Sequence, residues 1–335
     1  MNTTVVGNYP KIPNRPRPAR LRAAIARFDR GEIGEDELHR VQDEVTQEVI
    51  DEQVQAGIDL ITDGQIRWDD EVTYFARRLT NVSINGLERF FDNNTYYRQP
   101  VIEGPIAWSG PVTLGDYRFA AAHSPKPVKA VLTGPYTLSR LSLDEHDGSL
   151  EKLTLAYAEA VNAEARALQE AGCPVIQLNE PALLKHKDDF ALFEKACRRA
   201  LDRVSAEKAL YFYFGDVGGL YPQLLDLPID TLGLDFVSGP RNWELIDKAP
   251  FPSAGGGSAF GGKKLGLGIV DGRNTRMEAP EAIASGVQRA LKRLPPERLY
   301  VNPNCGLEFL PREVAQAKLA RMVEAVRRGV EAFWI

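Results

Sequence analysis

Short apolar runs alternate along the chain with longer segments in which apolar residues recur every three or four positions. The runs have strand length and are apolar on both faces, which is typical of strands buried in a parallel sheet. One long segment, SLEKLTLAYAEAVNAEARALQEAG, has the period of an amphipathic helix and ends at Gly172. The pattern predicts eight strands, at residues 3–7, 58–62, 128–134, 174–178, 209–214, 231–237, 264–270 and 298–303.

Eight strand-then-helix units predict an α/β fold of the (β/α)8 TIM barrel type, formed by residues 1–335 as a single domain. In such a barrel the active site lies at the carboxyl ends of the strands. Residues 81–112 have no helical period, and an Asn85-Gly86 turn there predicts a hairpin-like insertion over the barrel mouth. The glycine-rich residues 253–262 are interpreted as a loop within the barrel rather than a linker.

Composition narrows the class of protein. Apolar residues make up 44% of the 335 residues and the net charge is −5, which favours neither a disordered chain nor a nucleic-acid partner. There is no apolar stretch of membrane-spanning length and no signal-peptide pattern, so a cytoplasmic protein is expected. The three cysteines, Cys173, Cys197 and Cys305, are too far apart for a disulfide framework or a C-x-x-C motif.

Polar residues follow nearly every predicted strand, each beside glycine or proline. A ligand site at the strand ends needs tight turns, close backbone approach and a few fixed polar groups. Ordinary turn chemistry explains any one of these motifs, whereas their joint occurrence after eight strands favours a site. The motifs are Gly7-Asn8, Asp63-Gly64-Gln65, Gly134-Pro135-Tyr136, Asn179-Glu180, Gly215-Asp216, Asp235, Asp271-Gly272-Arg273 and Asn302-Pro303-Asn304-Cys305-Gly306.

Seven segments in order, VGNYPKI, TDGQIR, TGPYTLSRL, IQLNEPAL, FGDVGG, GIVDGRNTR and NPNCGL, resemble the catalytic barrel of cobalamin-independent methionine synthase. NEPAL and NPNCGL are the most specific of them, and the resemblance covers essentially the whole chain in its short, single-barrel form. It implies a methyltransferase of one-carbon metabolism that acts on small-molecule substrates. A methyl-folate or a methyl-corrinoid would carry the methyl group, and a corrinoid protein would be the partner in the second case.

The family holds a zinc ion that binds the homocysteine thiol as a thiolate. Its ligands are a His-x-Cys pair on one strand, a Glu on the next, and the Cys of N-P-x-C-G. Cys305 matches the last of these, Asp235 is a shortened form of the Glu, and Phe212 and Phe214 are aligned with the His-x-Cys pair. Phenyl rings cannot ligate zinc, so zinc is predicted to be absent, with Cys305 and Asp235 as the ligands if any is bound.

Phe212 and Phe214 lie two apart and would share one face of a strand, where they would form an apolar floor for a flat or methylated ligand. Elsewhere, the two acids that hold the substrate ammonium group in the family are replaced by Gln65 and Asn179. Amides lack the charge that makes such pairing strong. Arg273 stands where a proton-donating His is proposed in the family, and Arg stays protonated.

The predicted catalytic residues are Asp235, Cys305, Arg273 and Glu180. The residues predicted to bind substrate or carrier are Gly7, Asn8, Gln65, Arg98, Tyr136, Asn179, Phe212, Phe214, Asp216 and Asp271. Each has a structural alternative: Cys305 as a buried core thiol, Asp216 and Asp235 as helix caps, and the two phenylalanines as core residues. Arg98, in YYRQPVIEG, matches a family Arg-x-Pro element that would contact a carboxylate or phosphate, or it is a surface residue.

Three functions follow from these substitutions. The leading one is methyl transfer without a conventional zinc site, to an acceptor other than homocysteine. The second is standard methionine synthesis with an altered zinc site. The third is a non-catalytic barrel that binds a pterin or corrinoid.

Overall fold

The computed structural model describes residues 1–13, 18–248 and 262–331. The chain forms two compact units, each built from discontinuous segments. Unit 1 comprises Met1–Arg67, Arg118–Val128 and Leu267–Ile335, and unit 2 comprises Trp68–Tyr117 and Lys129–Gly266. That the whole chain is one domain stays a prediction. The glycine-rich tract at 253–262 falls outside the described residues, apart from Gly262.

The core of unit 2 is a parallel sheet. Its strands pair in the order β4 (Ala130–Thr133), β6 (Val175–Asn179), β7 (Glu207–Phe212), β8 (Thr231–Asp235) and the start of β9 (Lys264–Val270), which continues into unit 1. The register places Leu132, Leu178, Leu210 and Leu232 side by side on one face, all essentially inaccessible to solvent. The strands β4, β6 and β8 are buried on both faces, which is why their sequences are mostly apolar.

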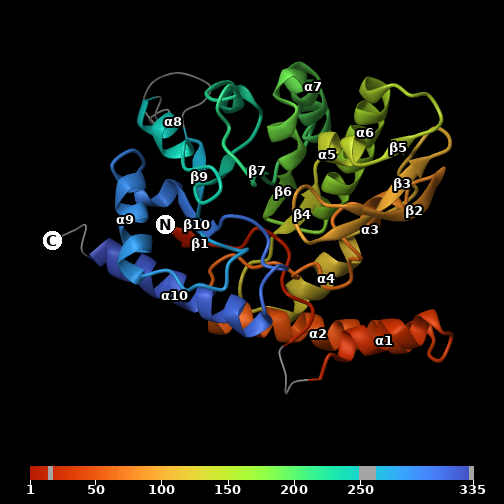
Figure 1. The fold of residues 1–335 in the computed structure, drawn as a ribbon, viewed down its shortest axis with the longest axis horizontal. Helices are drawn as coiled ribbons and strands as arrows, with labels where there is room; N and C mark the ends of the chain where they lie inside the picture. Colours follow the sequence, from red (N-terminus) through yellow and green to blue (C-terminus); the bar gives the residue numbers. More distant parts are fainter. Residues whose placement is uncertain (14–17, 249–261, 332–335) are drawn as a thin grey trace. The chain divides into compact units, whose positions relative to one another are not determined.

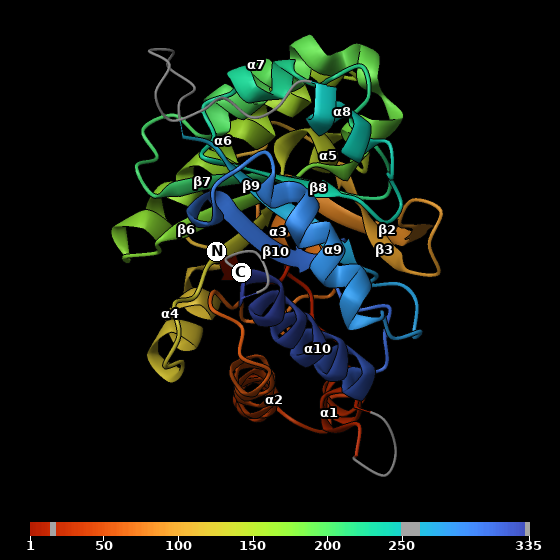
Figure 2. The same ribbon diagram turned by 90° about the vertical axis from the view of Figure 1, so that its left-hand side faces the viewer.

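Helices pack on this leucine face of unit 2. The long helix α6 (Leu150–Glu170) begins at Ser149, whose hydroxyl accepts a hydrogen bond from the Lys152 N–H, and it is followed by Gly172 at φ 86°. It packs against both α5 (Pro135–Arg140) and α7 (Phe190–Ala200), and Figures 1 and 2 show the three helices on the same side of the sheet. The remaining helices of this unit are α3 (Thr73–Ala76) and α8 (Asn242–Lys248), and α4 (Leu114–His123) runs from unit 2 into unit 1.

The predicted insertion is a hairpin of β2 (Val82–Arg89) and β3 (Tyr96–Ile102), with β5 (Leu143–Asp144) parallel to β3. The predicted position of its turn is wrong. Asn85-Gly86 lies within β2, where the register shifts between Ile84 and Leu87, so the dipeptide forms a bulge. The chain reverses instead at residues 90–95, closed by a 2.8 Å hydrogen bond from the Phe90 N–H to the Thr95 carbonyl.

In unit 1, β1 (Asn2–Thr3) lies parallel to β10 (Leu299–Pro303), which is next to β9. The predicted strand at 58–62 is present only as isolated parallel bridges, Thr4 to Leu60 and Ile61 to Val128. The helices are α1 (Arg20–Asp29), α2 (Glu35–Gln55), α9 (Pro280–Leu291) and α10 (Arg312–Glu331).

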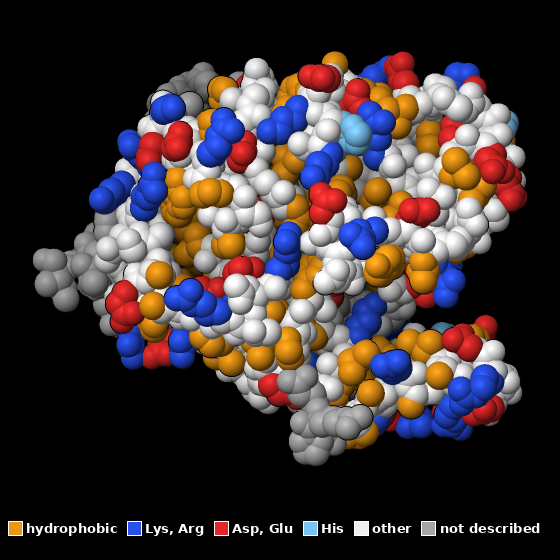
Figure 3. Space-filling model, in the orientation of Figure 1, with side chains coloured by type: hydrophobic (Ala, Val, Ile, Leu, Met, Phe, Trp, Pro, Cys, Tyr) orange, Lys and Arg blue, Asp and Glu red, His pale blue; other side chains and the backbone are white. Residues whose placement is uncertain are grey.

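Helix α10 packs against α9 and α2 within unit 1. At its start the guanidinium of Arg312, whose side chain is 1% exposed, lies 3.0 Å from Glu52 and 3.2 Å from Glu48 of α2. By contrast α1 and the start of α2 carry exposed, interspersed charges of both signs (Figure 3), including Arg20 paired with Glu44. In the described part of the chain, no helix is both long and apolar enough to cross a membrane.

Candidate functional site

The inner face of the unit 2 sheet, opposite the leucines, carries polar and aromatic side chains. The register places Asn179 of β6 between Thr133 of β4 and Tyr211 of β7. The Tyr211 ring extends across the neighbouring strands: a Cβ at Gly233 would lie 2.2 Å from this ring, and one at Gly266 would lie 2.5 Å from its hydroxyl oxygen. Gly233 and Gly266 are therefore required by the close approach of Tyr211.

Tyr213 continues this inner face and reveals an acid that sequence reasoning missed. Its hydroxyl donates a 2.7 Å hydrogen bond to Glu71 Oε2, and the Thr133 hydroxyl donates a 2.5 Å hydrogen bond to the Glu71 carbonyl. Glu71 is only 6% exposed. It lies in the run Asp69-Asp70-Glu71 before α3, and the sequence carries no signal that separates it from the exposed Asp69 and the half-buried Asp70.

The expectation that Phe212 and Phe214 share one face is wrong. Phe212 is 1% exposed and its ring centroid lies 5.9 Å from that of Phe193 of α7, so it belongs to the packing between sheet and helix. The strand ends at Phe212, and Phe214 has φ 72°, so strand alternation does not extend to it. The Phe214 ring contacts Phe90 and Phe91 at the hairpin turn, with centroids 6.3 and 5.8 Å apart.

Asp235 organises the loops after β7 and β8. It is fully buried and accepts hydrogen bonds of 3.0, 2.9 and 2.8 Å from the N–H groups of Phe214, Val237 and Ser238. Asp216 accepts a 2.9 Å hydrogen bond from the Gly218 N–H and lies 3.7 Å from the Lys187 ammonium. Asp235 and Asp216 thus accept hydrogen bonds from nearby backbone N–H groups, as carboxylates that stabilise turns do. A catalytic or binding role for either stays a prediction.

Glu180 is buried behind the start of α5. Its carboxylate accepts hydrogen bonds from the Tyr136 N–H (3.0 Å), the Thr137 N–H (2.7 Å) and the Thr137 hydroxyl (2.6 Å). Burial outweighs these contacts and raises the pKa of Glu180 to about 7. A Cβ at Gly134 would lie 2.2 Å from this carboxyl group, so GPYT and NEP form one interlocked element.

Tyr136 and Arg98 have different surroundings. The Tyr136 hydroxyl donates a 2.6 Å hydrogen bond to Asp189 and accepts one of 2.9 Å from Arg140, and burial raises the pKa of Tyr136. Arg98 is exposed on β3. Its backbone N–H donates a 3.1 Å hydrogen bond to the Thr73 hydroxyl oxygen. Arg98 therefore lies at the surface, and its contact with a carboxylate or phosphate stays a prediction.

In unit 1, Gln65 has the features of a ligand-binding residue. It is 2% exposed, has φ 52°, and neither atom of its side-chain amide has a hydrogen-bond partner among the described residues. A buried amide without partners costs free energy unless something else satisfies it. The preceding loop is fixed by hydrogen bonds of 3.0 Å from the Tyr9 N–H to the Gly64 carbonyl and 2.8 Å from the Thr62 hydroxyl to the Gly7 carbonyl.

The NPNCGL and VDGRN segments meet in the same unit. The Gly272 N–H donates a 2.8 Å hydrogen bond to the Asn304 side chain, and a Cβ at Gly272 would lie 3.1 Å from the Cys305 sulfur. Cys305 is fully buried, and its thiol donates to the Gly306 carbonyl over 3.3 Å. The Arg273 N–H donates to Asp271 over 2.9 Å, while the Arg273 side chain is exposed. The Asn8 carbonyl accepts a 3.0 Å hydrogen bond from the Leu307 N–H.

The donor set for a metal is poor. Among residues 1–13, 18–248 and 262–331 no three His, Cys, Asp or Glu side chains are grouped to hold an ion. Tyr211, Phe212, Tyr213 and Phe214 are all aromatic, so no alignment of a His-x-Cys pair within this stretch supplies a zinc ligand. The residues present do not fit a conventional zinc site.

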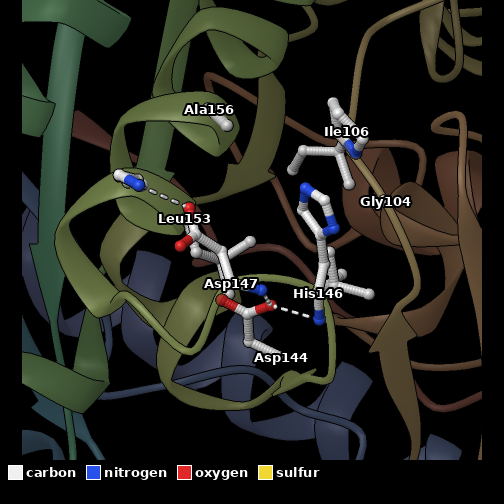
Figure 4. A pocket seen from close by; sticks show the side chains of 10 residues that line it. Gly104, Ile106, Asp144, His146, Asp147, Leu153 and Ala156 are labelled. Carbon is white, nitrogen blue, oxygen red and sulfur yellow. Dashed lines mark hydrogen bonds and ion pairs between the residues drawn. The ribbon is translucent and has the colours of Figure 1, made fainter.

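A pocket of about 250 Å³ lies elsewhere in unit 2, between the hairpin sheet and the start of α6. In Figure 4, the His146 imidazole lies near Ile106 and Gly104, and Asp144 accepts hydrogen bonds from the backbone N–H groups of His146 and Asp147. None of the predicted site residues lines this pocket.

Solved structures show the class of fold. A B12-independent methionine synthase from Shewanella sp. W3-18-1, in complex with selenomethionine, superposes with a TM-score of 0.83 over 100% of this chain and 99% of that one, at 23% identity. The putative vitamin-B12 independent methionine synthase from Listeria monocytogenes gives 0.75 over 98% of each chain, at 19% identity. The fold is α/β and TIM-barrel-like, as the strand pattern predicted.

Sequence comparison then gives the family. Residues 1–210 and 257–328 match the family described as “Cobalamin-independent synthase, Catalytic domain”. A methionine synthase from Saccharolobus solfataricus is 31% identical over 97% of this chain and 93% of that protein, and one from Sulfurisphaera tokodaii is 31% identical over 97% and 91%. The chain belongs to the cobalamin-independent methionine synthase family, in its single-barrel form. The family match omits residues 211–256, which include the aromatic residues Tyr211 to Phe214 and all of β8.

Proposed function

We propose that this chain is a methyltransferase that moves a methyl group from methyl-folate to a small-molecule acceptor without a conventional zinc site. Family membership supports the reaction class. The proposal that transfer needs no conventional zinc site rests on the run of aromatic residues from Tyr211 to Phe214. This run lies at the strand end where the resemblance places a His-x-Cys pair. In the reaction, the bond from the carrier nitrogen to the methyl carbon breaks and a bond from the acceptor to that carbon forms. The acceptor loses its proton, and the carrier nitrogen gains one.

Each unit holds a neutral residue that the sequence predicts to bind substrate or carrier, and each residue is considered by itself. Gln65 has a buried amide with no partner in the described part of the chain, and Asn179 lies on the inner face of the unit 2 sheet at the end of β6. Both are neutral, which supports an acceptor whose recognition does not depend on an ammonium-to-carboxylate pair. The acceptor is therefore proposed to differ from homocysteine.

The test is methyl transfer by purified protein from methyl-folate to a panel of thiols and hydroxy acids, with and without a zinc chelator, followed by mass spectrometry. Chelator-resistant transfer is expected, and Gln65→Ala is expected to lower it about tenfold or more, because one or two substrate hydrogen bonds are lost. Gln47→Ala, at a half-buried position in α2, is the control.

Standard methionine synthesis is the second candidate, because relatives over nearly the whole chain are named methionine synthase. Chelator-sensitive transfer to homocysteine would establish it and overturn the first proposal. Transfer only from methylcobalamin would assign a corrinoid donor. Pterin or corrinoid binding without any turnover would identify a binding protein.

A further inference from the structure

Three buried side chains form a hydrogen-bonded chain on the inner face of unit 2. The Lys129 ammonium donates a 2.6 Å hydrogen bond to Gln177 Oε1, and Gln177 Nε2 donates one of 2.7 Å to Asn179 Oδ1. The three residues are 2%, 0% and 2% exposed. None of these contacts depends on the loops, because Gln177 and Asn179 lie on β6 and Lys129 directly precedes β4.

The direction of the two hydrogen bonds follows from the chemistry of lysine. An ammonium group can only donate, so the Gln177 oxygen must face Lys129 and its nitrogen must face Asn179. Asn179 therefore accepts through its oxygen and turns its nitrogen the other way. Among the described residues, no hydrogen bond donated by that nitrogen is found.

The surroundings hold Lys129 and Asn179 in place. The Lys129 nitrogen lies 5.1 Å from the centroid of the Tyr211 ring, a cation–π contact that favours the ammonium form. Burial lowers the pKa of Lys129 to about 7, opposed by the carboxylate of Glu207. On either side of Asn179, the Thr133 hydroxyl is used by Glu71, and the Tyr211 ring fills the space at Gly233 and Gly266.

We propose that Lys129 and Gln177 are positioning residues that fix Asn179 as a hydrogen-bond donor, so that the site takes an acceptor substrate with a hydroxyl, keto or carboxylate oxygen there in preference to an ammonium group. The inference rests on the proposed methyltransferase function for the substrate skeleton. An ammonium group and the Asn179 N–H are both donors and repel each other. A ligand oxygen accepts the hydrogen bond.

The probe is a pair of ligands with one skeleton: methionine and 2-hydroxy-4-(methylthio)butanoate. Binding is measured by calorimetry at pH 6.5, where most of Lys129 is protonated, with no methyl donor present. The wild-type protein is expected to bind the hydroxy acid about tenfold more tightly, the effect of roughly one hydrogen bond.

Gln177→Glu is the decisive variant. A glutamate accepts from Lys129 but cannot donate to Asn179, so the Asn179 amide turns over and presents its oxygen. The preference is expected to move about tenfold towards methionine although Asn179 itself is unchanged. Asn179→Asp is expected to shift it the same way, and Lys129→Met to weaken discrimination. Lys208→Met, which removes a lysine that pairs with Asp230, is the control and leaves the preference as it was.

Equal or tighter binding of methionine by the wild-type protein would overturn the inference, as would no binding of either compound or an unchanged preference in Gln177→Glu. Thermal melting confirms that each variant is folded. If Asn179→Asp does not fold, the ligand preference of Gln177→Glu alone decides the inference. Because no turnover is involved, failed methyl transfer with retained ligand preference would reject the proposed function and leave this inference standing.

Discussion

Thr137 donates two hydrogen bonds to Glu180, one from its backbone N–H at 2.7 Å and one from its hydroxyl at 2.6 Å. The pair joins the end of β6 to the start of α5, two segments more than forty residues apart in the chain. Despite these donors, burial raises the pKa of Glu180 from 4.5 to about 7. The Glu180 carboxyl therefore makes the stability of the protein depend on pH.

The folded state binds the Glu180 proton more tightly than the unfolded state, so the free energy of unfolding falls as pH rises from about 4.5 to 7. We expect Glu180→Gln to remove this contribution, about 3 kcal/mol across the window. Urea denaturation at several pH values measures it. The exposed Glu170→Gln should retain the wild-type slope. Parallel pH profiles for wild type and Glu180→Gln would contradict the assignment.

Arg312→Met is expected to lower the free energy of unfolding by about 3–5 kcal/mol, because it leaves Glu52 without its buried partner. Arg20→Met removes an exposed ion pair with Glu44 and should cost at most about 1 kcal/mol. Chemical denaturation of both variants measures the difference. If both variants lose a similarly small free energy of unfolding, the buried ion pair of Arg312 and Glu52 does not stabilise the fold.

Phe214→Ala is expected to loosen the hairpin of β2 and β3. The Phe214 ring, just after β7, packs against the rings of Phe90 and Phe91 at the hairpin turn. Amide hydrogen exchange across residues 82–102 should accelerate, with a loss of about 2 kcal/mol in stability. Leu87→Ala, at a side chain that is 62% exposed, is the control. Unchanged protection of the hairpin would mean that other contacts hold it.

Purified protein is expected to contain far less than one zinc per chain, and Cys305→Ala is expected to leave that content unchanged. The reason is that a stable zinc site needs at least three ligands, and the described residues around Cys305 do not supply them. Elemental analysis by mass spectrometry is the measurement, with the buried Cys197→Ala as the comparison. One zinc per chain that is lost with Cys305 would reject zinc-independent transfer.

The strand pattern located the fold because buried parallel strands are apolar on both faces and stand out from their surroundings. Seven of the eight predicted runs overlap the strands β1, β4 and β6 to β10, and residues 58–62 form bridges only. The lack of a helical period predicts the hairpin, but Asn85-Gly86 lies in a bulge of β2 and not at the turn. Asn and Gly suit a bulge as well as a turn, and local sequence does not separate the two.

The site was harder to predict, because the face of the sheet towards which a side chain points depends on what packs against the strand. Four aromatic residues in a row carry no alternation, so nothing in Tyr211 to Phe214 shows that Phe212 faces Phe193. Lys129 was missed because a lysine at a strand start is usually exposed. Glu71 was missed for the same reason, within a run of acids.

The fit of the Tyr211 ring over Gly233 and Gly266 also constrains how this protein can change over evolutionary time. Any side chain at either glycine collides with the ring, whereas a smaller residue at position 211 leaves a cavity that a new side chain can fill. A route to a different chemistry at this strand must therefore change Tyr211 first. The order of substitutions, and not only their identity, decides which descendants of this sequence can fold.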